Sequence, residues 1–161
     1  MRRYLLTGLG AVVAGLLLLS GGDRTVWAHC QVPCGIYDDS ARISAMLEDT
    51  TTIAKAMGEI HKLAEKKDPL GYNQLTRWII TKEEHASRII DTVAAYFLTQ
   101  KVQEVEPGAE GRAAYLESLA THHRVMRLAM KCKQTVDPAN AEALKAAIEK
   151  LGKLYHHGHQ H

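Results

Sequence analysis

The chain has 161 residues, of which 46% are hydrophobic and 24% are charged, with four prolines and twelve glycines. This length favours one domain, and the hydrophobic fraction with few prolines excludes a collagenous or wholly disordered chain. Three of the 20 basic residues and one of the 18 acidic residues precede residue 29, which leaves 17 of each after it. Because no basic excess remains, nucleic acid is not an expected partner.

Residues 1–28 have the organisation of a cleavable signal peptide. Two arginines precede an apolar run over residues 5–19, and Ala28 ends a Val-Trp-Ala tripeptide that is typical of a cleavage site. The alternative is an uncleaved membrane anchor, but this run contains three glycines and is shorter than the roughly 20 apolar residues that span a bilayer. The sequence therefore predicts export to the periplasm or the extracellular space, with residues 29–161 as a mature chain that has no stable membrane anchor.

Residues 29–37 read His-Cys-Gln-Val-Pro-Cys-Gly-Ile-Tyr and form a candidate metal-binding hook. After cleavage, His29 offers a primary amine and an imidazole, while Cys30 offers its backbone nitrogen and its thiolate. Pro33 favours an extended residue before it, so the chain can fold back and bring Cys34 beside Cys30. Two thiolates, an amine and a deprotonated amide make a planar donor set, which favours Cu(II) or Ni(II) over tetrahedral Zn(II).

A disulfide between Cys30 and Cys34 is the alternative interpretation, because paired cysteines normally form one in an oxidising compartment. A disulfide requires neither a histidine at the new N-terminus nor the proline, glycine and tyrosine that accompany the cysteines. Without metal the two thiols would still oxidise. Metal therefore has to bind first, or the cysteines have to be kept reduced.

Four helices are predicted after the hook, at residues 40–66, 73–102, 110–133 and 137–155. Apolar side chains recur in them at spacings of three and four, and residues 38–40 offer caps for the first helix. The apolar stripe of the second helix is wide enough for an oligomer contact as well as a core. In the third predicted helix, the apolar side chains expected on one buried side are Leu116, Leu119, Met126 and Met130. Because no strand-like alternation occurs, the sequence predicts an all-α, up-and-down four-helix bundle with an irregular N-terminal hook.

Residues 156–161 read His-His-Gly-His-Gln-His, and a tract of this kind can bind nickel, zinc or copper. Two interpretations of this tail are open: it helps to load nickel, or it has no function. Cys132 is expected to be a partly buried thiol rather than a reactive one. His122 and His123 are expected to be ordinary residues of the third helix.

The motif His-Cys-x-x-Pro-Cys-Gly-x-Tyr at a processed N-terminus closely resembles the hook of nickel superoxide dismutases. Six fixed residues match within nine positions, and the size and helical pattern of residues 29–161 also agree with that family. The resemblance implies a homohexamer in which each chain binds one nickel ion. It implies an enzyme that converts superoxide to dioxygen and hydrogen peroxide while nickel alternates between Ni(II) and Ni(III).

The resemblance also assigns roles to the hook residues. His29 would supply its amine and, in the oxidised state, its imidazole as an axial ligand. Cys30 would supply its amide and thiolate, and Cys34 the second thiolate. Tyr37 would stand near the open axial face as the catalytic side chain, where it orders water and limits the access of anions.

Pro33 and Gly35 would support the hook, and the family keeps the bond before this proline cis, which is here Val32–Pro33. Some members hold the axial imidazole with a carboxylate on the first helix, paired with an arginine on the second. Those positions fall at Ser44 and His85, so either side chain could hydrogen-bond His29. For His85, a surface or interface histidine is the alternative.

A secreted nickel or copper carrier without turnover is the alternative function, with the hook and the tail as two binding stations. A carrier should release its metal readily and show no redox turnover. A purely structural bundle with a loop disulfide is a third possibility, and metal analysis separates it from the other two.

Overall fold

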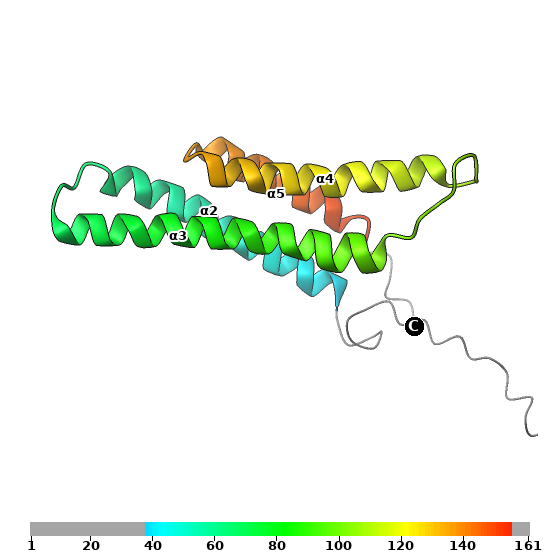
Figure 1. Ribbon diagram of the computed structural model, residues 1–161, viewed down its shortest axis with the longest axis horizontal. Helices are drawn as coiled ribbons and strands as arrows, with labels where there is room; N and C mark the ends of the chain where they lie inside the picture. The colour runs from blue at the N-terminus through cyan, green and yellow to red at the C-terminus, as the bar shows by residue number, and fades with distance from the viewer. Residues whose placement is uncertain (1–37, 156–161) are drawn as a thin grey trace, which may run out of the picture.

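The computed structural model describes residues 38–155, which fold into helices without any strand (Figure 1). Four of the elements are α-helices, and a π-helix, η1, continues the second of them. Their bounds are α2 Asp39–Leu63, α3 Pro69–Asp91, η1 Thr92–Lys101, α4 Arg112–Gln134 and α5 Pro138–Gly152. The predicted all-α class is confirmed for this part of the chain, and the hook lies outside it.

The helices form an up-and-down bundle, since each one runs opposite to the one before it (Figure 1). Neighbours in sequence pack together, and α5 also packs against α2, which closes the bundle around one core. As a result, one end of the bundle brings together the start of α2, the end of η1, the start of α4 and the end of α5 (Figure 1).

Aspartate caps determine where three of the helices start. Asp38, Asp68 and Asp137 each accept a hydrogen bond from a first-turn backbone N–H, at 2.7, 2.9 and 3.0 Å respectively. The cap predicted at residues 38–40 is thus confirmed. The second helix begins at Pro69 and not at residue 73, because Asp68 and Pro69 repeat the cap-and-proline signal seen at the start of α5.

The core is made of apolar side chains from all the helices, but α4 contributes differently from the expectation. Leu116 and Met130, predicted on its buried side, are 50% and 39% exposed. The side chains that α4 buries are Thr121, His122, Val125, Ala129 and Cys132. Of the other two predicted residues, Met126 packs against the core and Leu119 is half-buried. The predicted side was therefore only partly right, because small and hydrogen-bonded polar residues occupy most of the inner face.

Cys132 is fully buried at that inner face, and burial raises the pKa of its thiol to about 11. A thiol with this pKa carries almost no thiolate near neutral pH, and the thiolate is the reactive form. The expectation of an unreactive, buried cysteine is confirmed.

Lys82 of α3 is 3% exposed, and its ammonium group caps the C-terminal end of α4. Its Nζ donates to the carbonyl oxygens of Cys132 at 2.8 Å and Lys133 at 2.6 Å, and it pairs with Glu83 at 2.8 Å. The last carbonyls of an α-helix have no partner within the helix, so a buried ammonium group satisfies them. This contact ties α3 to the end of α4.

His122 is also fully buried, at the bundle end where α2 starts. Its Nδ1–H donates to the Ser118 carbonyl oxygen at 2.8 Å, so its Nε2 accepts from the Tyr155 hydroxyl at 2.7 Å. The Phe97 ring lies 4.6 Å from the Tyr155 ring, centroid to centroid. Burial lowers the pKa of His122 and raises that of Tyr155. Both histidines lie on the predicted helix, but His122 is buried and hydrogen-bonded whereas His123 is exposed.

We expect His122→Gln to make the stability of the fold less dependent on pH. The folded chain keeps this imidazole neutral while the unfolded chain binds a proton near pH 6.5, so wild-type stability is present above that pH and is lost below it. The loss grows as the pH falls further below that value, because the unfolded chain then gains the proton more completely.

Urea denaturation at about pH 7.5 and about pH 5.5 measures this difference. His123→Gln, on the exposed neighbour, should keep the wild-type pH dependence. The same pH dependence in His122→Gln as in the wild type would contradict the neutral, buried imidazole.

Candidate metal centre

The predicted hook ends immediately before Asp38, the cap of α2, and lies outside the described residues. Its roles therefore stay predictions, together with the cis bond at Val32–Pro33. The residues concerned are His29, Cys30, Pro33, Cys34, Gly35 and Tyr37. The described part of the chain shows the end of the bundle to which this segment is attached.

Asp39, the first residue of α2, ties the start of that helix to η1. Its Oδ1 accepts a hydrogen bond from the Tyr96 hydroxyl at 2.5 Å, and its Oδ2 lies 3.1 Å from Lys101 Nζ. The Arg42 guanidinium lies 5.6 Å from the centroid of the Tyr96 ring. Hydrogen bonds to an ionised carboxylate are stronger than neutral ones, so these contacts fix the point at which the hook joins the bundle.

The π-helical winding of η1 allows both of its residues to reach Asp39. Side chains five residues apart on an α-helix are separated by about 140° around the axis. In a π-helix the hydrogen bonds join residues five apart, so Tyr96 and Lys101 lie one turn apart on nearly the same side. The bond from the Val102 N–H to the Phe97 carbonyl, at 3.0 Å, shows this pattern. The sequence predicted one continuous helix here, because its apolar spacing carries no sign of the change.

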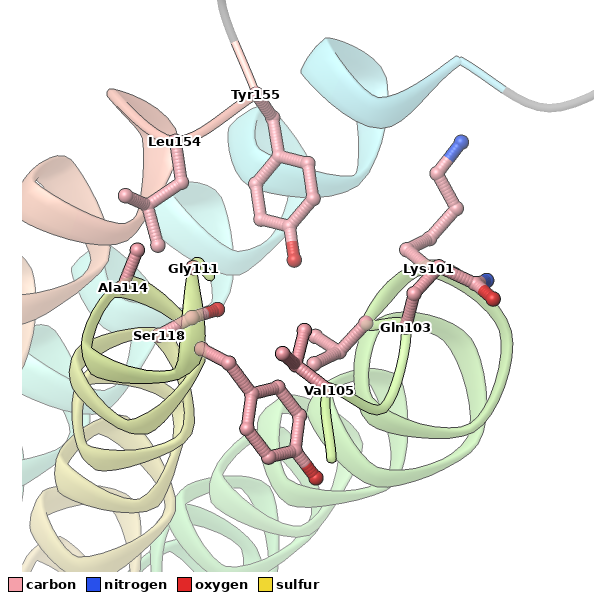
Figure 2. Close-up of a pocket in the computed structure, with 10 residues that line it drawn as sticks. Lys101, Gln103, Val105, Gly111, Ala114, Ser118, Leu154 and Tyr155 are labelled. Atoms are coloured by element: carbon pink, nitrogen blue, oxygen red, sulfur yellow. The ribbon is translucent and has the colours of Figure 1, made fainter. Parts of the chain in front are cut away.

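An open hollow of about 420 Å³ lies next to this anchor, between the end of η1, the start of α4 and the end of the described chain. Lys101 and Gln103 line one side of it, and Leu154 and Tyr155 line another (Figure 2). Since Lys101 is also the partner of Asp39, the hollow adjoins the attachment point of the hook.

Ser44 and His85, the predicted partners of the His29 imidazole, are both described. Ser44 is exposed on α2. His85 of α3 directs its Nδ1–H to the Asp49 carboxylate at 2.6 Å, and Arg88 Nε lies 3.3 Å from the same oxygen. Because His29 lies outside the described residues, the predicted contact to either side chain stays a prediction.

Asp49 is the carboxylate that the sequence interpretation missed. It lies on α2 three residues after Met46 and four before Ile53, both of which are buried. Asp49 therefore falls on the side of α2 that the helical period predicts to be buried, and a carboxylate there needs a charged or hydrogen-bonding partner. This position was the sequence feature that could have revealed the pair. Asp49 therefore links α2 to His85 and Arg88 of α3, while the predicted contact of residue 44 with His29 stays a prediction.

Within residues 38–155, no three His, Cys, Asp or Glu side chains are grouped so that they could hold a metal ion. No helix in this part of the chain is both long enough and apolar enough to cross a membrane. The hook has a donor set that suits nickel, because thiolates and nitrogen donors in a plane match the geometry that Ni(II) prefers.

The described residues form a helical bundle, and the segment before it carries the predicted metal donors. A model of the nickel-containing superoxide dismutase family matches residues 24–158. Because this match includes the hook and all four α-helices, the chain belongs to the nickel-containing superoxide dismutases. The family predicted from the hook is thereby confirmed, with its nickel cofactor and its substrate, superoxide. No curated protein and no solved structure matched the chain significantly.

We expect Asp39→Asn to destabilise the bundle by about 1 kcal/mol, because an amide no longer forms the ion pair with Lys101 and accepts more weakly from Tyr96. The urea midpoint measures this loss. Glu117→Gln is the control, since its pair with Lys150, at 2.8 Å, lies on the exposed surface and should contribute almost nothing. Equal midpoints for Asp39→Asn and the wild type would disprove the anchor.

Proposed function

We propose that the chain, once cut after Ala28, is a nickel superoxide dismutase whose ion is held by His29, Cys30 and Cys34. The observation that carries this proposal is the family match, which extends over a segment containing these donors. The reaction converts two superoxide anions and two protons to one dioxygen and one hydrogen peroxide.

The chemistry of each proposed donor explains why it suits a nickel ion that changes oxidation state. Cleavage releases the amine of His29, which is an amide while residue 28 is attached. The thiolates of Cys30 and Cys34 and the deprotonated amide of Cys30 are anionic, so they favour the more highly charged oxidation state of a bound ion. Nickel in this set supplies a one-electron step between Ni(II) and Ni(III).

The chain's own residues control access and protons. Tyr37 would lie near the bound ion, where its hydroxyl would order water and limit which anions enter. Pro33 and Gly35 shape the hook around the donors. Since the charges after residue 28 sum to zero, attraction of the superoxide anion has to be local to the hook.

The bundle supports this arrangement by fixing the root of the hook. Asp38 caps α2, and Asp39 holds the first turn of that helix to Tyr96 and Lys101. The residues to which the C-terminal end of the hook is attached, Asp38 and Asp39, are therefore held in place by the bundle. Such an attachment limits the freedom of the short segment that has to wrap the ion.

Residues 1–28 act in this proposal as a signal peptide that directs the chain to the periplasm or the extracellular space. Two features support it: the composition of the segment and the need for a free amine at His29. Removal of the segment leaves residues 29–161 as one domain.

We also propose that the enzyme is a homohexamer. The first half of α3 supports this, because Tyr72, Ile79 and Ile80 are 55%, 41% and 49% exposed. Their spacing of seven and eight residues places them on one side of the helix. An exposed apolar surface of this kind is suited to contact with another copy of the chain.

We expect protein purified from its native host to begin at His29 and to contain about one nickel ion per chain, because the proposed donors exist only after cleavage. N-terminal sequencing, metal analysis and light scattering measure processing, content and assembly. Partly oxidised samples should show a rhombic Ni(III) resonance with nitrogen hyperfine splitting from the imidazole of His29. Activity that follows zinc, iron or manganese content would overturn the nickel assignment.

Replacement of either hook cysteine should abolish turnover while leaving the fold intact. In Cys30→Ser or Cys34→Ser, a hydroxyl that stays protonated replaces an anionic donor, so the Ni(III) state becomes inaccessible. His29→Ala should retain partial activity, since it keeps the amine and loses the axial imidazole.

The control for these variants is Cys132→Ala, which removes a buried thiol in the last turn of α4 and should retain activity. All variants need the same processed N-terminus, with superoxide turnover and helical circular dichroism as the measurements. Full activity in Cys34→Ser, or a loss confined to Cys132→Ala, would show that the redox site lies elsewhere.

A further inference from the structure

We propose that Tyr155 and His122 form a redox site that reduces oxygen radicals, with Tyr155 as the electron donor and His122 as the proton acceptor. The oxidants concerned are strong one-electron oxidants, such as the hydroxyl radical, that arise when hydrogen peroxide takes up a single electron. Hydrogen peroxide is a product of the dismutation that this family carries out. The activity at Tyr155 is separate from dismutation and uses no residue of the hook.

The two side chains are joined by one hydrogen bond whose direction is fixed. The Nδ1–H of His122 donates to the Ser118 carbonyl oxygen at 2.8 Å, so the lone pair of Nε2 accepts from the Tyr155 hydroxyl at 2.7 Å. A base at this distance can receive the phenolic proton as soon as the ring loses an electron. The pair is therefore arranged so that electron loss and proton loss occur together.

His122 is a suitable proton acceptor because it is neutral inside the bundle. Its side chain is fully buried, and burial lowers its pKa, so near neutral pH its Nε2 carries no proton. Imidazole is also the side chain that takes up and returns a proton most easily in this pH range. Burial, and in second place the negative charge of Asp39, raise the pKa of Tyr155, so the phenol keeps its proton until it is oxidised.

Small oxidants reach this pair through the open hollow beside it. Tyr155 lines the hollow of about 420 Å³, and Figure 2 shows its hydroxyl pointing into that space. The Tyr155 ring also packs against the fully buried Phe97, with 4.6 Å between the ring centroids. A half-buried ring of this kind is open to small radicals but is shielded from coupling with the ring of another protein molecule.

The redox cycle has two steps that conserve atoms and charge. In the first, the oxidant takes one electron from Tyr155 and the phenolic proton moves to His122 Nε2, which leaves a neutral tyrosyl radical beside an imidazolium ion. In the second, superoxide gives one electron to the radical and becomes dioxygen, while the imidazolium returns the proton and restores the pair. The net change is one electron passed from superoxide to the oxidant, so a hydroxyl radical becomes hydroxide.

Tyr115 offers a matched comparison, because it lines the same hollow. The Arg112 guanidinium lies 5.1 Å from the centroid of the Tyr115 ring. A guanidinium ion has no lone pair with which to accept a proton. Tyr115 therefore meets the same oxidants beside a cation instead of a base.

The electron donor is tested by pulse radiolysis of the full processed chain, with azide radicals as the one-electron oxidant. We expect a long-lived tyrosyl radical, detected by absorption and by electron paramagnetic resonance, which Tyr155→Phe removes and Tyr115→Phe leaves unchanged. Circular dichroism shows whether each variant keeps its fold. Persistence of this radical in Tyr155→Phe, or its loss in Tyr115→Phe, would overturn the assignment.

The proton acceptor is tested by His122→Gln in the same experiment. This variant should shorten the lifetime of the radical several-fold, because an amide accepts the hydrogen bond but does not take up the proton. A second measurement needs no variant: the radical on Tyr155 should form more slowly in heavy water, since a proton moves with the electron. An unchanged lifetime in His122→Gln, or equal rates in light and heavy water, would disprove the role of the imidazole.

The return of the electron is tested in the full processed chain with Cys30→Ser and Cys34→Ser together, so that the hook does not consume superoxide. Superoxide should shorten the lifetime of the Tyr155 radical several-fold, and equal lifetimes with and without superoxide would disprove this step. A wild-type chain that forms the radical but shows no superoxide turnover would refute the proposed function alone. Normal turnover without a radical on Tyr155 would refute the redox site alone.

Discussion

The contact of Asp39 with Tyr96 and Lys101 is the constraint on which the functional end of this protein depends. It joins the first turn of α2, and hence the root of the hook, to the last turns of the neighbouring helix. It exists because η1 is wound as a π-helix, which brings two residues five apart to the same side. A regular α-helix over the same residues would direct one of them away from the carboxylate.

Buried polar groups determine how the rest of the bundle closes around this anchor. Lys82 satisfies the last carbonyls of α4, and His122 links α4 to Tyr155 beyond the end of α5. Both groups are fully partnered, because a buried donor or acceptor left alone costs about 1–3 kcal/mol. Cys132 shares this interior, where burial raises the pKa of its thiol.

The scaffold and the chemistry are therefore separated along the chain. The helices form a core that holds no metal-binding group within residues 38–155, while the proposed donors of the hook precede them. The aromatic contacts of Tyr96 with Phe97 and of Phe97 with Tyr155 join η1 to the end of the described chain.

The family was identifiable from the sequence because the candidate metal donors fall within nine consecutive residues, and local signals also predicted four helices and the cap at residues 38–40, although not the cap at Asp68. The tertiary structure alone decided the pairs His85–Asp49, His122–Tyr155 and Lys82 with the Cys132 carbonyl. Their members lie 36, 33 and 50 residues apart. Which of them meet depends on the rotation of each packed helix about its axis, which apolar spacing specifies only coarsely, as the exposed Leu116 and Met130 show. The π-winding of η1 was equally hidden, since it leaves no period in the sequence.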